Sequence, residues 1–302
     1  MGDGPGFLTL APGVLAVRCP KPHSHTGMVS MVVADGGRLA VIDTGMREHA
    51  LAALLPALGA LGARPQDIAI LCATHGHADH VGGCGPLREL TSAAACFSPL
   101  DAELAGAVPD LPARAGQVID LGSLRFEVLP TPGHTPGSSC FYERSLRLLI
   151  AGDAVQSRGS AGRLPVYYDS GRDYRASLRE LLRIPVETLL TGHPLRGPGL
   201  EGCIHRGTDT CRELLTMSLG YAQSVERAVA TGVRVLTDDP AEPLHFPTLR
   251  RFVLDELSRE PLYAEAELTS AELEEDEDVT ATLLSETRDL GILLEAAPSV
   301  RR

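Results

Sequence analysis

The sequence predicts a mixed α/β body followed by a mainly helical C-terminal extension. Short apolar runs typical of strands recur between residues 28 and 193, and segments with helical spacing of apolar residues lie between them. After about residue 200 the patterns are helical only. Strands interleaved with helices in this way favour two sheets, or one mixed sheet, covered by helices. We therefore expect an α/β body over residues 1–200 and a mainly helical region over residues 201–302.

The individual elements are predicted from local patterns. Residues 28–34 and 38–43 are strand-like and flank DGG, which is a hairpin turn signal. Residues 48–62 have helical spacing, and the continuous apolar run 68–73 is typical of a buried strand. Further strands are predicted at 93–98, 124–130, 138–143, 147–153 and 186–193, and further helices at 81–92, 174–184, 205–232 and 246–260.

The composition is that of a folded globular protein. The chain has 302 residues, of which 44% are apolar and 22% charged, which is enough to bury a sizeable core. Its formal charge of −12 argues against binding nucleic acid, because a phosphate backbone is held by clustered Lys and Arg. Lys21 is the only lysine, and all other basic residues are arginines.

The cysteines and the N-terminus indicate the compartment. The seven cysteines are odd in number, scattered and without a CxxC pair, which predicts reduced, mostly structural thiols. The N-terminus lacks a basic segment followed by an apolar one, and no stretch approaches 18 uninterrupted apolar residues. We therefore expect a soluble, cytoplasmic protein that does not bind membranes.

Residues 72–83, CATHGHADHVGG, concentrate side chains that can bind metal ions. His75, His77, Asp79 and His80 directly follow the predicted buried strand and are separated only by glycine or alanine. Such small residues leave room for the ligand-type side chains to converge. A single histidine is usually structural, so this stretch alone leaves both interpretations open.

Three later segments carry a candidate ligand just after a predicted strand. TPGHTPGSS places His134 in a loop rich in Pro and Gly, LLIAGD places Asp153 at a strand end, and LLTGH places His193 at another. Ligands at the ends of several strands converge on one rim. The four segments together therefore predict a shared metal site.

These motifs resemble those of the metallo-β-lactamase superfamily. The HxHxDH motif of that family corresponds to residues 75–80, and its later single ligands correspond to His134, Asp153 and His193. IDTG at 42–45 also matches, with Asp43 in the family's supporting position. The resemblance covers residues 28 to about 200. It implies an αββα sandwich with the active site at one edge between the sheets.

The resemblance also implies two metal ions and a ligand set for each. The first ion would be held by His75, His77 and His134, and the second by Asp79, His80 and His193, with Asp153 bridging the two. Imidazole and carboxylate ligands suit two Zn²⁺ ions, and iron and manganese also accept this set.

The implied chemistry is hydrolysis. Two close cations that share a water lower its pKa, so that a bridging hydroxide forms near neutral pH and attacks a carbonyl polarised by one ion. The resemblance gives Asp79 a further role in orienting the hydroxide or moving its proton, and it gives Asp43 the role of hydrogen-bonding a ligand. We therefore expect a dinuclear zinc hydrolase that acts on a small-molecule thioester, ester or lactone.

Differences from the sequence patterns of individual branches of the family narrow the choice of reaction. The N-terminus and Asp153 disfavour secreted β-lactamases, and His77 disfavours the flavodiiron type. Gln156 stands where acyl-homoserine lactonases tend to have tyrosine. AVQSRGSAG after Asp153 differs from the glyoxalase II pattern and disfavours glutathione thioesters. A mononuclear iron persulfide dioxygenase, which shares the THxHADH motif, stays a competing reaction class.

A second alternative comes from the arginine-rich, lysine-poor composition, which is similar to that of actinomycete proteins. Metallo-β-lactamase-fold enzymes of that group include the actinorhodin-type second-ring cyclase and releasing thioesterases of aromatic polyketide antibiotic biosynthesis. By this analogy the chain would be a polyketide cyclase with thioesterase activity on a substrate bound to an acyl carrier protein.

Substrate contacts are predicted outside the ligand motifs. Tyr167, Tyr168 and Arg175 lie between Asp153 and His193 in the sequence and are candidates, with ordinary loop packing as the alternative. His23 and His25 precede the strand at 28–34; His25 is a candidate to line the cleft, with an exposed loop as the alternative. The C-terminal helices are expected to wall the pocket, and homo-oligomerisation is compatible with the sequence.

Overall fold

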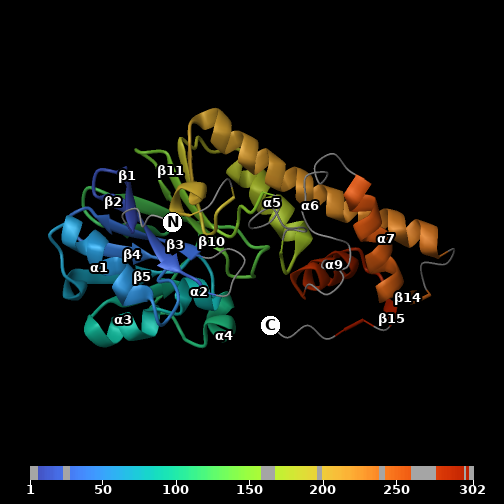
Figure 1. Cartoon of the computed structure of the whole chain (residues 1–302), viewed down its shortest axis with the longest axis horizontal. Helices are drawn as coiled ribbons and strands as arrows, with labels where there is room; N and C mark the ends of the chain where they lie inside the picture. The colour runs from blue at the N-terminus through green and yellow to red at the C-terminus, as the bar shows by residue number, and fades with distance from the viewer. Residues whose placement is uncertain are drawn as a thin grey trace.

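The computed structural model describes residues 6–22, 28–157, 167–195, 199–237, 242–259, 277–295 and 297–298. These residues form two β-sheets stacked between layers of helices, with a helical region at one end (Figure 1). The mixed α/β fold class and the αββα arrangement are therefore confirmed.

The first sheet has seven strands in sequence order. They are β1 (Phe7–Ala11), β2 (Val14–Pro20), β3 (Met28–Asp35), β4 (Leu39–Ile42), β5 (Ile68–Cys72), β6 (Ala94–Phe97) and β7 (Leu111–Pro112). The first four strands are antiparallel neighbours, and β3 and β4 form the hairpin predicted from DGG. β4 to β7 are parallel.

The second sheet has six strands in the order β13-β12-β11-β10-β9-β8. They are β8 (Val118–Asp120), β9 (Arg125–Pro130), β10 (Ser139–Glu143), β11 (Leu148–Gly152), β12 (Thr188–Thr191) and β13 (Ile204–Arg206). Only β11 and β12 run parallel within this sheet; the helix α5 (Gly171–Leu181) lies in the crossover between them.

The packing of the core explains why most strands are continuous apolar runs in the sequence. Side chains alternate between the two faces of a strand, and here both faces are buried. In the first sheet, Val32 of β3 packs in the cluster between the sheets, whereas Val33 packs with Leu54 of the helix α1 (Ala50–Ala60). In the second sheet, Phe141 faces the first sheet and Tyr142 faces the helices on the other side.

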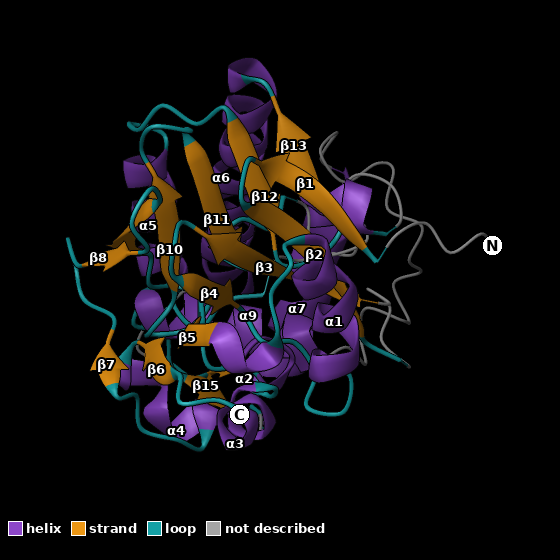
Figure 2. Cartoon of the chain, turned by 90° about the vertical axis from the view of Figure 1, so that its left-hand side faces the viewer, coloured by secondary structure: helices purple, strands orange, loops and turns teal. Residues whose placement is uncertain are grey.

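The remaining helices cover the sandwich and extend beyond it (Figures 1 and 2). They are α2 (Ala78–Val81), α3 (Cys84–Leu90), α4 (Ala102–Ala105), α6 (Thr208–Leu236), α7 (Phe246–Arg259) and α9 (Glu277–Asp289). The short strands β14 (Leu244–His245) and β15 (Leu294–Glu295) pair in parallel beside α7.

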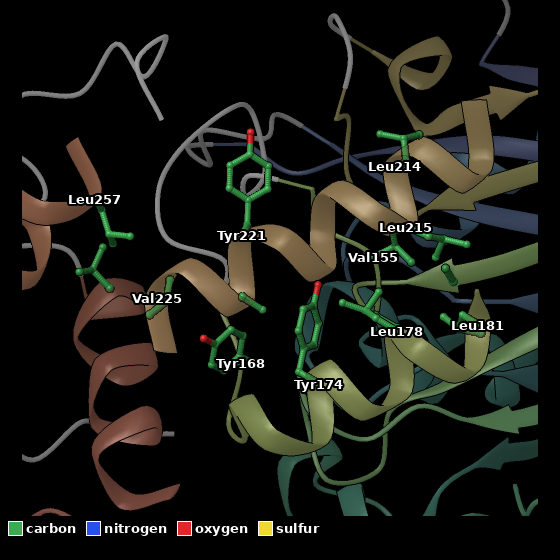
Figure 3. Packing of buried hydrophobic residues seen from close by; sticks show 14 of the residues in the cluster. Val155, Tyr168, Tyr174, Leu178, Leu181, Leu214, Leu215, Tyr221, Val225 and Leu257 are labelled. Atoms are coloured by element: carbon green, nitrogen blue, oxygen red, sulfur yellow. The ribbon is translucent and has the colours of Figure 1, made fainter. Parts of the chain in front are cut away.

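One apolar cluster joins the body to the helical region. It contains side chains from the outer face of the second sheet and from α5, α6, α7 and α9. Figure 3 shows its central part, where Tyr174 and Leu178 of α5 face Leu215 of α6, whereas Tyr221 points to the other side of α6. α6 therefore links the sheet-bearing body to the C-terminal helices.

Several boundaries differ from the sequence-based prediction for local reasons. The helix predicted at 81–92 is two helices, because Gly82 and Gly83 interrupt it. The helix predicted from residue 205 starts at Thr208, since His205 lies in β13 and Gly207 has a φ of 95°. The helix predicted from residue 174 starts at Gly171, because the Ser170 side chain accepts a hydrogen bond from the Asp173 amide.

Two further features bear on the expectations from composition. All seven cysteines lie in the described residues and carry free thiols. None of the helices in the described residues combines the length and the apolar character that crossing a membrane requires.

Candidate metal centre

The predicted ligands lie where strands of both sheets end. β5 of the first sheet ends at Cys72 and leads into residues 75–80. In the second sheet, His134 follows β9, Asp153 directly follows β11, and His193 lies two residues after β12. The structure brings all seven side chains together in three overlapping groups, in each of which the ligand atoms lie within 4.8 Å of one another.

The first group consists of three histidines. Nε2 of His134 lies 3.2 Å from Nε2 of His75 and 3.0 Å from Nδ1 of His77. The rings of His75 and His77 are nearly perpendicular, with centroids 4.7 Å apart. Three imidazole nitrogens thus converge on one point, as the ligand set predicted from the resemblance requires.

The second group consists of Asp79, His80 and His193. Oδ2 of Asp79 lies 3.2 Å from Nε2 of His193 and 3.9 Å from Nε2 of His80. Both Asp79 and His80 come from the short helix α2, and both are buried.

Asp153 lies between the two groups. Its Oδ2 is 3.6 Å from Nε2 of His134 in the first group and 3.4 Å from Nε2 of His193 in the second. Its Oδ1 is 3.6 Å from Nε2 of His80. A Cβ atom on Gly192 would lie 2.2 Å from Asp153 Oδ1, so only glycine fits beside this carboxylate.

The second ring nitrogen of most of these histidines is held by an acceptor. Nδ1 of His134 donates to the carbonyl of Tyr167 at 3.0 Å, and Nδ1 of His193 donates to the carbonyl of Met28 at 2.9 Å. Nδ1 of His80 lies 2.9 Å from Oδ2 of Asp43. Because carbonyls and carboxylates only accept, a proton is placed on Nδ1, and Nε2 faces the cluster.

Asp43 supports the ligands, in the position that the resemblance gives it. Besides His80, its carboxylate accepts hydrogen bonds from the amide and the hydroxyl of Thr74, at 2.7 and 3.0 Å. Oγ1 of Thr74 in turn lies 3.1 Å from Nδ1 of His75. Asp43 has a φ of 56°, a left-handed conformation that Asp tolerates better than most residues.

Burial and charge set the ionisation of the ligands. Burial holds the pKa of His75 well below its usual value and lowers the pKa of His77 to about 4. Burial likewise lowers the pKa of His134. These three imidazoles are therefore neutral near pH 7, which is the form that binds metal ions.

The second group attracts positive charge. Burial opposes protonation of His80, but the carboxylates of Asp43, Asp153 and Asp79 outweigh it and raise the pKa of His80 to about 9. Burial also opposes ionisation of Asp79 and Asp153, yet nearby histidines, and Lys21 in the case of Asp79, hold both pKa values below the usual range.

The residues present fit divalent metal ions. His80 Nε2 is buried without a hydrogen-bond partner in the described structure, and it faces Asp79 and Asp153. A cation at this nitrogen would replace the proton and satisfy the atom. Imidazole and carboxylate donors are the ligands of zinc, iron and manganese sites.

Asp101 is a supporting residue that the sequence does not reveal. Its buried Oδ2 accepts hydrogen bonds from the Gly76 amide at 2.8 Å and the Thr135 hydroxyl at 2.7 Å, and its Oδ1 accepts from the Gly137 amide at 2.7 Å. A Cβ on Gly137 would lie 2.5 Å from Asp101 Cγ, so glycine permits this approach. One carboxylate thus ties the loop between His75 and His77 to the loop after His134.

Lys21 also contacts the site. Lys21 directly follows β2, and its Nζ lies 2.6 Å from Oδ2 of Asp79. Lys21 is conspicuous in the sequence as the only lysine, but no sequence motif connects it with the predicted ligands.

Of the predicted substrate contacts that the structure describes, one lies beside the candidate metal centre and two bind a C-terminal helix. The ring of Tyr167 lies 5.1 Å from that of His134 and 5.8 Å from that of His77, so Tyr167 is beside the metal centre. The hydroxyl of Tyr168 and the guanidinium of Arg175 instead bind Glu286 of α9, each at 2.5 Å. This packing corresponds to the alternative given above for Tyr168 and Arg175. His23 and His25 lie outside the described residues.

Several known proteins are similar to this chain in sequence. An uncharacterized protein of Aquifex aeolicus is 36% identical over 182 residues, which are 54% of this chain and 82% of that protein. Hydroxyacylglutathione hydrolases of Cereibacter sphaeroides and Xylella fastidiosa are 34% and 30% identical over 46% and 58% of this chain. This chain spans only 53% and 62% of the length of those two hydrolases.

Solved structures share the fold. A metallo-beta-lactamase family protein from Thermus thermophilus matches with a TM-score of 0.65 and 22% identity, over 94% of this chain and 95% of that one. A beta-lactamase domain protein from Burkholderia ambifaria matches with a TM-score of 0.64 and 17% identity, over 87% and 89%.

The family model of the metallo-beta-lactamase superfamily matches residues 27–193. This range is more than half of the chain, and it contains Asp43 and all seven residues of the candidate metal centre. The chain therefore belongs to the metallo-beta-lactamase superfamily.

Proposed function

We propose that this chain is a dinuclear metal-dependent hydrolase, with zinc as the expected metal, that acts on a small-molecule thioester, ester or lactone. The first ion would be held by His75, His77 and His134, and the second by Asp79, His80 and His193. The observation that carries the proposal is the position of Asp153, whose carboxylate lies within 3.6 Å of nitrogens from both groups.

Divalent ions bound at these residues would activate water and polarise the substrate carbonyl. The chain's own residues prepare that chemistry. Neutral His75, His77 and His134 present lone pairs to one point, while the carbonyls and carboxylates on the Nδ1 atoms of His134, His193 and His80 fix the ring orientations. Asp79 is held ionised, so it can bind a cation; its role in orienting the hydroxide or moving its proton is the one that the family resemblance implies.

The substrate class is supported by relatives and by one side chain. Hydroxyacylglutathione hydrolases, which by name cleave an acylglutathione thioester, are related to this chain over about half its length. The ring of Tyr167 borders His77 and His134 and offers an apolar surface to an acyl group. The segment after Asp153 departs from the glyoxalase II pattern, so we propose a thioester other than that of glutathione.

The test is to measure metal content and turnover on the same preparation. Purified protein is freed of metal with a chelator, reloaded with zinc, iron or manganese, and assayed on a panel of acyl thioesters, esters and lactones. We expect about two zinc ions per chain and thioester hydrolysis that is lost on chelation and restored by zinc. Asp153→Asn should abolish most of this activity, whereas Asp120→Asn, which changes an exposed carboxylate, should not.

Four results would contradict the proposal. Folded protein that binds no divalent ion would rule out the metal centre. Zinc-loaded protein that hydrolyses no member of the panel would rule out this substrate class. One iron per chain, with oxygen consumption on a persulfide, would replace the hydrolase with a dioxygenase. Ring closure of a carrier-protein-bound polyketide by the loaded protein would point instead to the cyclase.

A further inference from the structure

The only lysine of the chain binds a predicted metal ligand. Lys21 Nζ lies 2.6 Å from Asp79 Oδ2, and the Lys21 side chain is 28% exposed, compared with 10% for Asp79. Lys21 follows the end of β2 at Pro20 and precedes Pro22. Its backbone is therefore constrained, while its four-carbon side chain reaches from the rim of the site toward the ligands.

The oxygen that binds Lys21 is the one that faces the second group of ligands. The same Oδ2 of Asp79 lies 3.2 Å from His193 Nε2 and 3.9 Å from His80 Nε2. A metal ion held by Asp79, His80 and His193 would have to use this oxygen or force the carboxylate to turn. The ammonium group thus contacts the carboxylate on the side where the second cation would bind.

We propose that the Lys21 ammonium is an internal cation that competes with the second metal ion for Asp79, so that the second ion binds only when Lys21 leaves. This inference rests on the two-ion centre of the proposed function. Lys21 is a positioning residue in this role, since it acts through Asp79.

The physical reason is repulsion between like charges at short range. A divalent ion and an ammonium on one carboxylate oxygen repel each other strongly, because the surrounding site is buried and screens charge poorly. A lysine side chain can resolve the conflict, since its head group is exposed in part and its stem is flexible. Within the part of the chain that the structure describes, no lysine or arginine side chain bonds to His75, His77 or His134. The two ions should therefore bind in order, with the second weaker.

The test compares zinc affinities of metal-free variants. Zn²⁺ is titrated into the wild type, Lys21→Met, Lys21→Arg and Arg18→Met in competition with a chromophoric chelator. Arg18 is a matched control, because it is an exposed cation on β2, close to Lys21 in the sequence. Lys21→Met should bind the second zinc about tenfold or more tightly than wild type, while the first affinity stays unchanged. Lys21→Arg, which keeps the charge, and Arg18→Met should each stay close to wild type.

A second readout does not depend on substitution. Since Lys21 is the only lysine, an amine acylating reagent modifies one side chain, and the extent of modification is read by mass spectrometry of the peptide that contains it. Labelling should increase when the second equivalent of zinc binds, because the ammonium then leaves Asp79 for solvent.

The outcomes separate this inference from the proposed function. Two ions bound with the same affinities by wild type and Lys21→Met would overturn the role of Lys21 and leave the metal centre intact. An equal gain in Arg18→Met would overturn it as well, because the effect would then be that of overall charge. Failure of every variant, Lys21→Met included, to bind a second ion would refute the two-ion centre itself.

Discussion

At the scale of single residues, the metal centre depends on side chains that are not themselves predicted ligands. Asp43 holds His80 directly and reaches His75 through Thr74. Asp101 accepts hydrogen bonds from the backbone amides of Gly76, between His75 and His77, and of Gly137, in the loop after His134. Asp101 therefore acts on the loops of the first group, whereas the direct contact of Asp43 is with His80 of the second group, and substitutions should separate their effects.

Asp101→Asn should weaken binding of the first metal ion by about 10- to 100-fold, in line with the cost of losing a partner that orients the ligands. The three groups that bind the Asp101 carboxylate, two backbone amides and the Thr135 hydroxyl, all donate hydrogen bonds. The NH₂ of an asparagine would face at least one of these donors, and that hydrogen bond would be lost. Zinc titration of the metal-free protein measures the effect.

The control for this prediction is Asp110→Asn. Asp110 is exposed in part and binds the Ala95 amide and Arg88, which are remote from the histidine loops in the sequence. The prediction for Asp101 is wrong if both variants bind zinc as the wild type does.

Asp43→Asn should instead weaken the second metal ion more than the first, again by about 10- to 100-fold. Asparagine tolerates the left-handed backbone at this position, so the fold should be kept while the negative charge beside His80 is lost. The measurement is the same two-step zinc titration, with circular dichroism to check the fold. Equal loss of both ions would contradict the division of the site between Asp43 and Asp101.

At the scale of secondary structure, burial explains part of what can be predicted from the sequence, although β2 is buried along most of its length and is not among the predicted strands. Strands such as β4 and β11 are buried on both faces, so they read as continuous apolar runs and were predicted within one or two residues. β1 is half-buried, and it was not predicted. α9 was also missed, since it follows an acidic stretch and depends on tertiary contacts for its partners.

α9 is fixed to the body by a buried ion pair. Glu286 is fully buried and accepts hydrogen bonds from Tyr168 and Arg175, and Arg175 also pairs with Glu226 of α6. Tyr168 directly follows Tyr167, whose carbonyl accepts a hydrogen bond from His134. α9 is therefore connected to the candidate metal centre through Tyr168 and its neighbour Tyr167.

Glu286→Gln should lower the free energy of unfolding by about 2–4 kcal/mol, because it leaves the buried guanidinium of Arg175 with one partly exposed carboxylate. Urea denaturation gives the value. Glu180→Gln breaks the exposed pair with Arg183 on α5 and should cost less than about 1 kcal/mol. If Glu286→Gln costs no more than this control, the pair does not secure α9.

At the scale of the whole molecule, the sequence predicts the seven candidate ligands but not what surrounds them. The seven candidates are recognisable in the sequence because His75, His77, His134, Asp153 and His193 stand in loops after strands and Asp79 and His80 complete a compact motif, and the fold brings these segments together. Asp101 and Lys21 were missed because their roles arise from contacts across 25 to 58 residues, which no local pattern encodes. For the same reason, the sequence leaves open whether Tyr168 and Arg175 contact the substrate or pack within the fold; in the structure both bind Glu286, and Arg175 also binds Glu226.

Metal binding should also stabilise the fold as a whole, because the ligand segments follow strands of both sheets and the ions would join them. Binding to the folded state alone contributes about 4 kcal/mol per site when free zinc is about 1,000 times Kd. The metal-free protein should therefore unfold at a clearly lower temperature than the zinc-loaded protein, and zinc should reverse the difference. Calorimetry on both forms measures this shift. Asp153→Asn loses the carboxylate between the two groups, so zinc should stabilise it less. If wild type with bound zinc melts at the same temperature as the metal-free form, the ions do not join the sheets.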